Sequence, residues 1–107
     1  MNPVVNEIAC RLKDLFQENI EDFEGLYVFG SQVRGDATDD SDVDIVAVFG
    51  RDLFNLPDEF YDILSQMRYD YYDIMDLDIH PKTRQELEFK PFFYEEVVNK
   101  RVFYGTR

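Results

Sequence analysis

Two aspartates separated by a single residue are the side chains in this sequence best suited to chemistry. Asp42 and Asp44 open an apolar, β-branched run that ends at Phe49 and predicts a strand over residues 42–49. In a strand, residues i and i+2 point to the same face, with Cα atoms about 6.5–7 Å apart. Two such carboxylates repel each other unless a cation lies between them, and they can bracket a pair of Mg²⁺ ions about 3.5–4 Å apart. The pair therefore predicts a two-metal magnesium site.

Two alternative interpretations of this acidic stretch fit the sequence less well. The first is the solvent face of an edge strand, but residues 45–49 are continuously apolar, as in a central strand covered on both sides. Ionised groups at the mouth of such a strand need a partner. The second is an EF-hand calcium loop starting at Asp40. There the required glycine would be Ile45 and the closing glutamate would be Arg51, so the loop does not fit.

A glycine–serine corner precedes the acidic pair. The apolar run 26–29 predicts a buried strand, and Gly30 lets the backbone turn sharply after it because no Cβ is in the way. Ser31 adds a hydroxyl and a backbone N–H where a helical turn can begin, which suits a phosphate. We expect a third carboxylate to complete the site. A third strand predicted over residues 71–79 offers Asp73, Asp76 and Asp78, and periodicity does not choose among them.

The remaining elements form a short α/β arrangement that positions these side chains. Helical spacing of apolar residues predicts helices, and the end of the chain is expected to be helical in two pieces broken at Pro91. The predicted segments are a helix over 3–22, a loop over 30–41, a helix over 57–69 and an extended end at 102–104. With 107 residues and no linker or repeat, we expect a single domain over 1–107.

Composition limits the classes of partner. The net charge of −12 repels phosphate backbones, so stable nucleic-acid binding by this chain alone is not expected, whereas a basic protein partner is. The single cysteine, Cys10, reads as a small core residue. No apolar run approaches ~18 residues, so we expect a cytoplasmic protein without a membrane span. A domain this small would need a partner or a second copy of itself to complete a site for a large substrate.

The spacing of these motifs resembles a known family. Gly30-Ser31, ten intervening residues and then Asp42-Val43-Asp44 are similar to the pattern of the DNA polymerase β-like nucleotidyltransferase superfamily, especially its minimal nucleotidyltransferase (MNT) branch. Arg34, Gly35 and Ser41 also stand where this branch commonly has them. The resemblance implies an α/β (α+β) fold, with a small mixed sheet and helices packed mainly on one face.

The resemblance also implies an activity, namely transfer of a nucleoside monophosphate from a nucleotide, usually ATP, to a hydroxyl. It assigns metal ligation to Asp42 and Asp44. Tyr72-Asp73-Ile74-Met75 resembles the Val-Asp-Leu-Val strand of the branch, which favours Asp73 as the third catalytic carboxylate and metal ligand. The same resemblance assigns contacts with the nucleotide triphosphate to four residues: Gly30, Ser31, Arg34 and Ser41.

Many members of this branch are antitoxins paired with HEPN-domain RNase toxins, and some are thought to add AMP to a tyrosine of the toxin. The resemblance therefore implies a HEPN-type partner and an antitoxin role. Two alternatives stay open. One is a non-catalytic antitoxin that neutralises its partner by occlusion, and the other is a nucleotidyltransferase acting on a small molecule, although members of that kind carry an extra helical domain.

Overall fold

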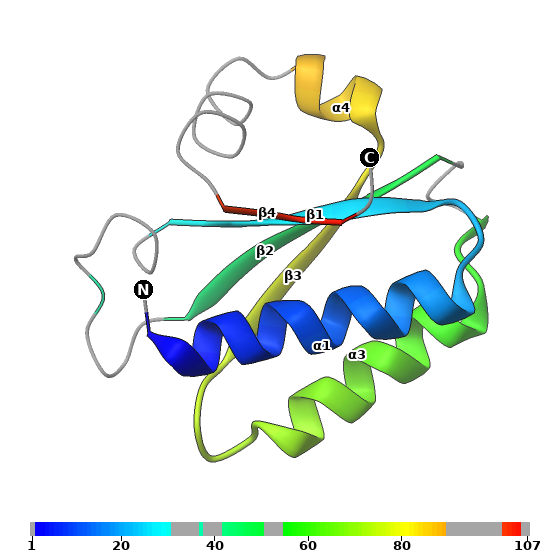
Figure 1. Cartoon of the computed structure of the whole chain (residues 1–107). Coiled ribbons are helices and arrows are strands. Elements are labelled where there is room, and N and C mark those ends of the chain that lie inside the picture. Colours follow the sequence, from blue (N-terminus) through cyan, green and yellow to red (C-terminus); the bar gives the residue numbers. More distant parts are fainter. Residues whose placement is uncertain (1, 31–36, 38–41, 51–54, 90–101, 106–107) are drawn as a thin grey trace.

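The computed structural model describes residues 2–30, 37, 42–50, 55–89 and 102–105 (Figure 1). The mixed α/β fold expected from the sequence is confirmed. The strands form one four-stranded sheet, and the helices pack against it. The elements in chain order are α1 (Pro3–Asn19), β1 (Phe23–Phe29), β2 (Val43–Phe49), α3 (Asp58–Asp70), β3 (Leu77–Lys82), α4 (Arg84–Phe89) and β4 (Val102–Tyr104). Among these helices, none is long and apolar enough to cross a membrane.

The sheet has the strand order β3-β2-β1-β4 and brings three strand ends to one edge. Strand β1 is antiparallel to both β2 and β4, whereas β2 and β3 are parallel and are connected through α3. Parallel strands begin at the same edge, and an antiparallel neighbour ends there. Gly30 after β1, Asp42 before β2 and Asp76 before β3 therefore share this edge, which we call the carboxylate edge. The backbone N–H of Val43 donates to the carbonyl of Asp76 at 2.9 Å.

Helices α1 and α3 lie side by side on one face of the sheet (Figure 1). The start of α1 is fixed by Asn2, whose side chain accepts a hydrogen bond from the N–H of Val4 at 2.9 Å, and by Pro3 in the first turn. Phe16 of α1 is fully buried, with its ring centroid 5.5 Å from that of Phe49 and 5.6 Å from that of Phe60. These rings join α1, β2 and α3 in the main core.

The opposite face of the sheet carries a smaller apolar cluster. Its buried members are Tyr27, Val46, Val48 and Leu87, the last supplied by α4, which lies on this face (Figure 1). The first turn of α4 is capped by Thr83, whose hydroxyl accepts from the N–H of Glu86 at 3.1 Å. Among the described elements the helices thus lie mainly on one face, as expected from the family resemblance, with the short α4 on the other.

The third strand is where the sequence prediction was wrong. A strand was expected over 71–79, but residues 71–74 form a turn after α3, and β3 begins at Leu77 and continues through Pro81 to Lys82. Tyr71 is buried, and its carbonyl accepts hydrogen bonds from Ile74 and Met75, which favours the turn. Pro81 is tolerated because β3 is an edge strand that needs no donor on its open side. The predicted loop 30–41 and the helical piece after Pro91 lie largely outside the described residues.

Candidate active site

The site is built on two aspartates that face each other across β2 and β3. Asp44 and Asp78 are direct partners in the parallel register. Their neighbours Val43, Ile45 and Ile79 all belong to the main core under α1 and α3. Because side chains alternate between the faces of a strand, both carboxylates lie on the opposite face. Adjacent strands are about 4.8 Å apart, so the two carboxylates are close enough to act on one ligand.

Among the described residues, burial and neighbouring carboxylates dominate the electrostatics of Asp44. Partial burial is the main cause that raises the pKa of Asp44, followed by the negative charges of Asp78 and then Asp42. His80 acts in the opposite direction, although more weakly than either aspartate. The ionised form of Asp44 is thus disfavoured here unless a cation compensates its charge.

Gly30 lies directly against the carboxylate of Asp44. Its backbone has φ +79°, a conformation that favours glycine. A Cβ added at this position would collide with Oδ2 of Asp44. The sharp corner predicted from the sequence is therefore present, and its backbone lies so close to Asp44 that a side chain here would displace the carboxylate. The other residues predicted to contact the triphosphate, Ser31, Arg34 and Ser41, lie outside the described residues.

Asp73 does not occupy the position that the sequence prediction gave it. It lies exposed in the turn that follows α3, outside β3. Among the described residues, the charged groups that act on Asp44 are Asp78, Asp42 and His80. The geometry therefore favours Asp78 as the carboxylate beside the Asp42/Asp44 pair. The sequence holds no signal that selects Asp78, because Asp73, Asp76 and Asp78 all stand between apolar or aromatic residues.

His80 is a neighbour of this site that the sequence did not assign to it. Its Nε2 lies 3.2 Å from Oδ1 of Asp78, and both side chains are about half exposed. His80 pairs in register with Val46, whose side chain belongs to the cluster on the same face as Asp44. The imidazole thus contacts one of the two carboxylate oxygens of Asp78.

The donor set suits a hard divalent cation. Carboxylate oxygens are the ligands that Mg²⁺ prefers, and a half-buried carboxylate with a raised pKa gains most from a cation. Within the described part of the chain, no group of three or more acidic, His or Cys side chains is already gathered around one point. Asp42 is exposed and acts on Asp44 more weakly than Asp78 does, so a cation would have to draw it in.

Several solved structures of similar fold are chains of toxin–antitoxin complexes. A chain in the crystal structure of a toxin–antitoxin with AMP-PNP is 22% identical, with a TM-score of 0.62, covering 88% of this chain and 70% of that one. A mutant MntA–HpeT toxin–antitoxin gives 19% identity and a TM-score of 0.64 over 100% of this chain and 76% of that one. A chain in the structure of the tri-AMPylated HEPN toxin of Shewanella oneidensis in complex with MNT antitoxin gives 17% identity and a TM-score of 0.60. The match covers 95% of this chain and 73% of that one.

At these identities the structural matches show a shared fold. No curated protein matches the sequence significantly. The model of the nucleotidyltransferase domain family, however, matches residues 6–104, which is nearly the whole sequence. The expected enzyme class is confirmed by this match, and the chain belongs to the nucleotidyltransferase domain family.

Proposed function

We propose that this protein transfers AMP from ATP to a hydroxyl of a protein partner, in a Mg²⁺-dependent reaction, and thereby acts as an antitoxin. The single observation that carries the proposal is the register pair Asp44/Asp78 beside Gly30, in a chain of the nucleotidyltransferase domain family. A phosphoryl-transfer site needs carboxylates close to a backbone corner whose N–H groups donate hydrogen bonds to phosphate oxygens. Both features meet at the carboxylate edge.

In this proposal Asp42, Asp44 and Asp78 hold the divalent metal. Bound there, Mg²⁺ would neutralise phosphate charge and favour ionisation of the acceptor hydroxyl. Asp78 takes the place that the sequence gave to Asp73, because Asp78 is the residue opposite Asp44. His80 holds one oxygen of Asp78 and so orients its carboxylate.

The nucleotide side of the site rests on Gly30 and the residues after it. The bare backbone of Gly30 beside Asp44 lets a triphosphate approach the carboxylates. Ser31, Arg34 and Ser41 keep their predicted role as triphosphate contacts. Rate enhancement would then come mainly from positioning and charge neutralisation, since phosphoryl transfer asks for little covalent chemistry from the protein.

The proposed partner is a HEPN-type helical toxin with a tyrosine acceptor, which would place the pair in the cytoplasm. Similar folds occur in toxin–antitoxin complexes, one of them containing an AMPylated HEPN toxin. The net charge of −12 also suits a basic partner, since opposite charge speeds and orients association. The single domain proposed for residues 1–107 leaves the acceptor to be presented by that partner.

The test is a transfer assay with the protein encoded in the adjacent reading frame, which this proposal expects to be of HEPN type. The two proteins are incubated with ATP and Mg²⁺, and intact mass spectrometry measures AMP added to the partner. Asp78→Asn and Asp73→Asn form a matched pair, because both remove one exposed carboxylate from neighbouring positions. We expect Asp78→Asn to lower the transfer rate by about 10³-fold and Asp73→Asn by less than about threefold.

Two outcomes contradict parts of this proposal. Loss of activity in Asp73→Asn together with normal activity in Asp78→Asn would return the third carboxylate to Asp73. If the double variant Asp42→Asn/Asp44→Asn still neutralises the toxin fully, and the wild type adds no AMP, the protein is a non-catalytic antitoxin that acts by occlusion.

A further inference from the structure

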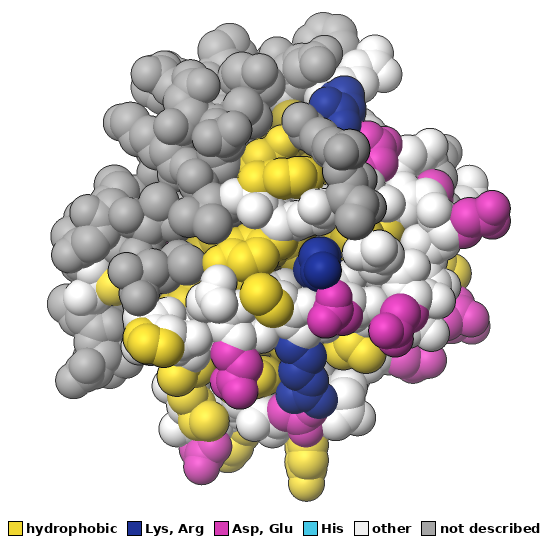
Figure 2. All heavy atoms as spheres, viewed as in Figure 1, with side chains coloured by type: hydrophobic (Ala, Val, Ile, Leu, Met, Phe, Trp, Pro, Cys, Tyr) yellow, Lys and Arg dark blue, Asp and Glu magenta, His cyan; other side chains and the backbone are white. Residues whose placement is uncertain are grey.

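An exposed apolar surface lies where α3 ends. Tyr69, Tyr72 and Ile74 expose 80%, 83% and 54% of their surface, although they are large apolar or aromatic residues. Figure 2 shows apolar side chains, with acidic ones between them, along the lower edge of the molecule. A cluster of this kind on a small protein marks a contact surface, and tyrosine is among the residues enriched in protein interfaces.

The surface is hollowed beside Tyr72. A depression of about 250 Å³ is lined by Tyr72, Met75 and Leu77, with Arg68 and Asp76 at its polar side. An apolar hollow with a few polar groups accepts an inserted side chain better than a flat patch does.

The backbone under this surface is held in place. Tyr71, between the exposed Tyr69 and Tyr72, is buried in the main core, and the guanidinium of Arg11 lies over its ring at 5.8 Å from the centroid. The N–H groups of Ile74 and Met75 both donate to the carbonyl of Tyr71 at 3.0 Å. The exposed side chains therefore project from the end of α3 and the ordered turn after it, which lowers the entropy lost when a partner binds.

This surface borders the carboxylate edge. Asp76, which lines the hollow, accepts the backbone hydrogen bond from Val43, and Asp78 follows two residues later. A protein seated on Tyr69, Tyr72 and Ile74 would thus reach the strand ends that carry the carboxylates. The position suits an acceptor protein, which has to bring a hydroxyl to that edge.

The charge around the surface selects the kind of partner. Asp73 and Asp76 are exposed within and beside it, opposed by the exposed Arg68 in the wall of the hollow, and the whole chain carries −12. A second copy of the chain would bring the same negative charge and be repelled. A partner with an apolar centre surrounded by Lys and Arg matches both the apolar side chains and the acidic ones.

We infer that Tyr69, Tyr72 and Ile74 form the surface on which the acceptor protein docks, through an apolar patch rimmed by basic residues. This inference rests on the proposed function, because it assigns the docking step of the same transfer reaction. Docking is separate from chemistry here, since none of the three residues belongs to the carboxylate pair or the glycine corner.

The experiment compares Tyr69→Ser/Tyr72→Ser with Tyr61→Ser. Tyr61 is a suitable control because it is 55% exposed and lies near the start of the same helix α3. The dissociation constant for the HEPN-type partner is measured by calorimetry, and KM and kcat for AMP transfer are measured in parallel. We expect the double variant to weaken binding and raise KM for the partner by at least about tenfold, with kcat within about twofold of wild type. Tyr61→Ser should match the wild type.

The readouts separate failure of docking from failure of the chemistry. Binding of the double variant within twofold of wild type overturns the inference, as does an equal loss in Tyr61→Ser. Wild-type self-association that the double variant abolishes, measured by analytical ultracentrifugation, also overturns it in favour of a second copy. Tight wild-type binding that the double variant loses, without any AMP transfer, supports the docking surface and contradicts the proposed activity. Absence of wild-type binding overturns both.

Discussion

The two faces of the sheet are built for opposite purposes, although they share the same strands. Along β2, Val43, Ile45 and Phe49 are buried against α1 and α3, whereas Asp44 faces the other way toward Asp78. The first face gains free energy from burial of apolar surface, and the second loses some to the repulsion of its carboxylates. The face under α1 and α3 thus supplies the stability that lets the second face keep unfavourable charges in place for a ligand.

The largest expected effect comes from removing an aromatic ring on the face under α1 and α3. Phe16→Ala should lower the free energy of unfolding by about 3–5 kcal/mol, because the ring is fully buried between those of Phe23, Phe49 and Phe60. On the second face, which carries Tyr27, Phe103 is only partly buried against that tyrosine, so Phe103→Ala should cost about 1–2 kcal/mol. Urea unfolding followed by circular dichroism measures both. Equal losses would contradict the assignment of the main core to one face.

A smaller loss of stability is expected at Gly30, where the end of β1 meets Asp44 of β2. Gly30→Ala should lower the free energy of unfolding by about 1–3 kcal/mol, because alanine is strained at φ +79° and its Cβ would meet the carboxylate of Asp44. In the double variant Gly30→Ala/Asp44→Ala the collision is absent, so the loss assigned to Gly30→Ala should shrink. Unfolding of the four proteins of this cycle measures the difference. Strict additivity would mean that backbone strain accounts for the whole loss.

The sequence predicted the face under α1 and α3 better than it predicted the site, and the reason is physical. That face follows from apolar periodicity, so α1, β1, β2 and α3 were found within a few residues of their observed bounds. The site needed the register between β2 and β3, which no local pattern contains. The stretch from Tyr71 to Asp76 alternates like a strand, but the burial of Tyr71 and its carbonyl hydrogen bonds make it a turn. Because β3 starts at Leu77, Asp78 rather than Asp73 stands opposite Asp44, and we therefore propose Asp78 as the third carboxylate.

Removing the charge of Asp44 should stabilise the protein in the absence of metal. Its pKa is raised on folding, so its protonated form favours the native state, and this contribution is lost as the pH rises through the raised pKa. At neutral pH, Asp44→Asn should therefore increase the free energy of unfolding by roughly 0.5 kcal/mol, a value that allows for solvent screening. The gain should disappear as the pH falls below the ordinary aspartate range.

The response of thermal stability to Mg²⁺ tests whether Asp44 is a metal ligand. Thermal unfolding at neutral pH, with and without Mg²⁺, should show stabilisation of the wild type by the metal and little change in Asp44→Asn, since binding to the native state raises its stability. Asp62→Asn on the exposed side of α3 is the matched control, and it should keep the full response to Mg²⁺. A normal metal response in Asp44→Asn would exclude Asp44 as a ligand.

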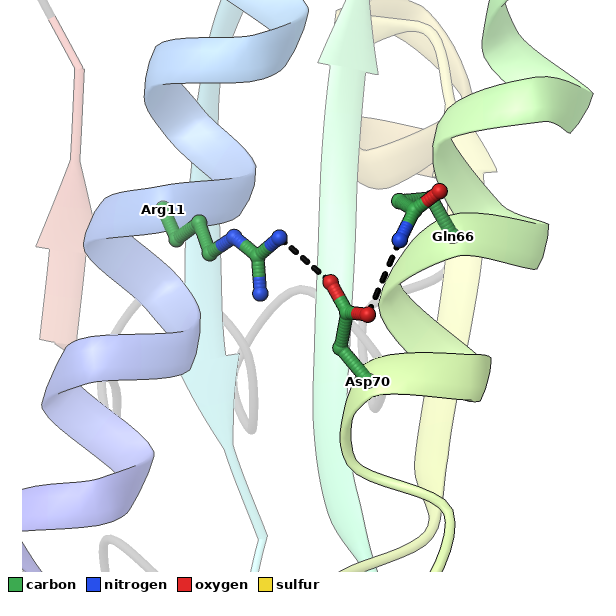
Figure 3. Close-up of polar contacts among 3 residues, drawn as sticks. All are labelled: Arg11, Gln66 and Asp70. Carbon is green, nitrogen blue, oxygen red and sulfur yellow. Dashed lines mark hydrogen bonds and ion pairs between the residues drawn. The ribbon is translucent and has the colours of Figure 1, made fainter.

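The smallest expected effect concerns a polar contact outside both faces, where α1 meets α3. Asp70 accepts hydrogen bonds from Gln66, at 2.8 Å, and from Arg11 (Figure 3). These two contacts, Gln66 first, lower the pKa of Asp70, so its contribution to stability is present at neutral pH and is lost as the pH falls through that lowered pKa. Both partners are solvent-accessible, so Asp70→Asn should lower Tm at pH 7 by only about 1–2 °C, and the difference should vanish near pH 2. Differential scanning calorimetry across this pH range measures it. A loss as large as that of Phe16→Ala would show that this surface contact, rather than the aromatic core, holds the two helices together.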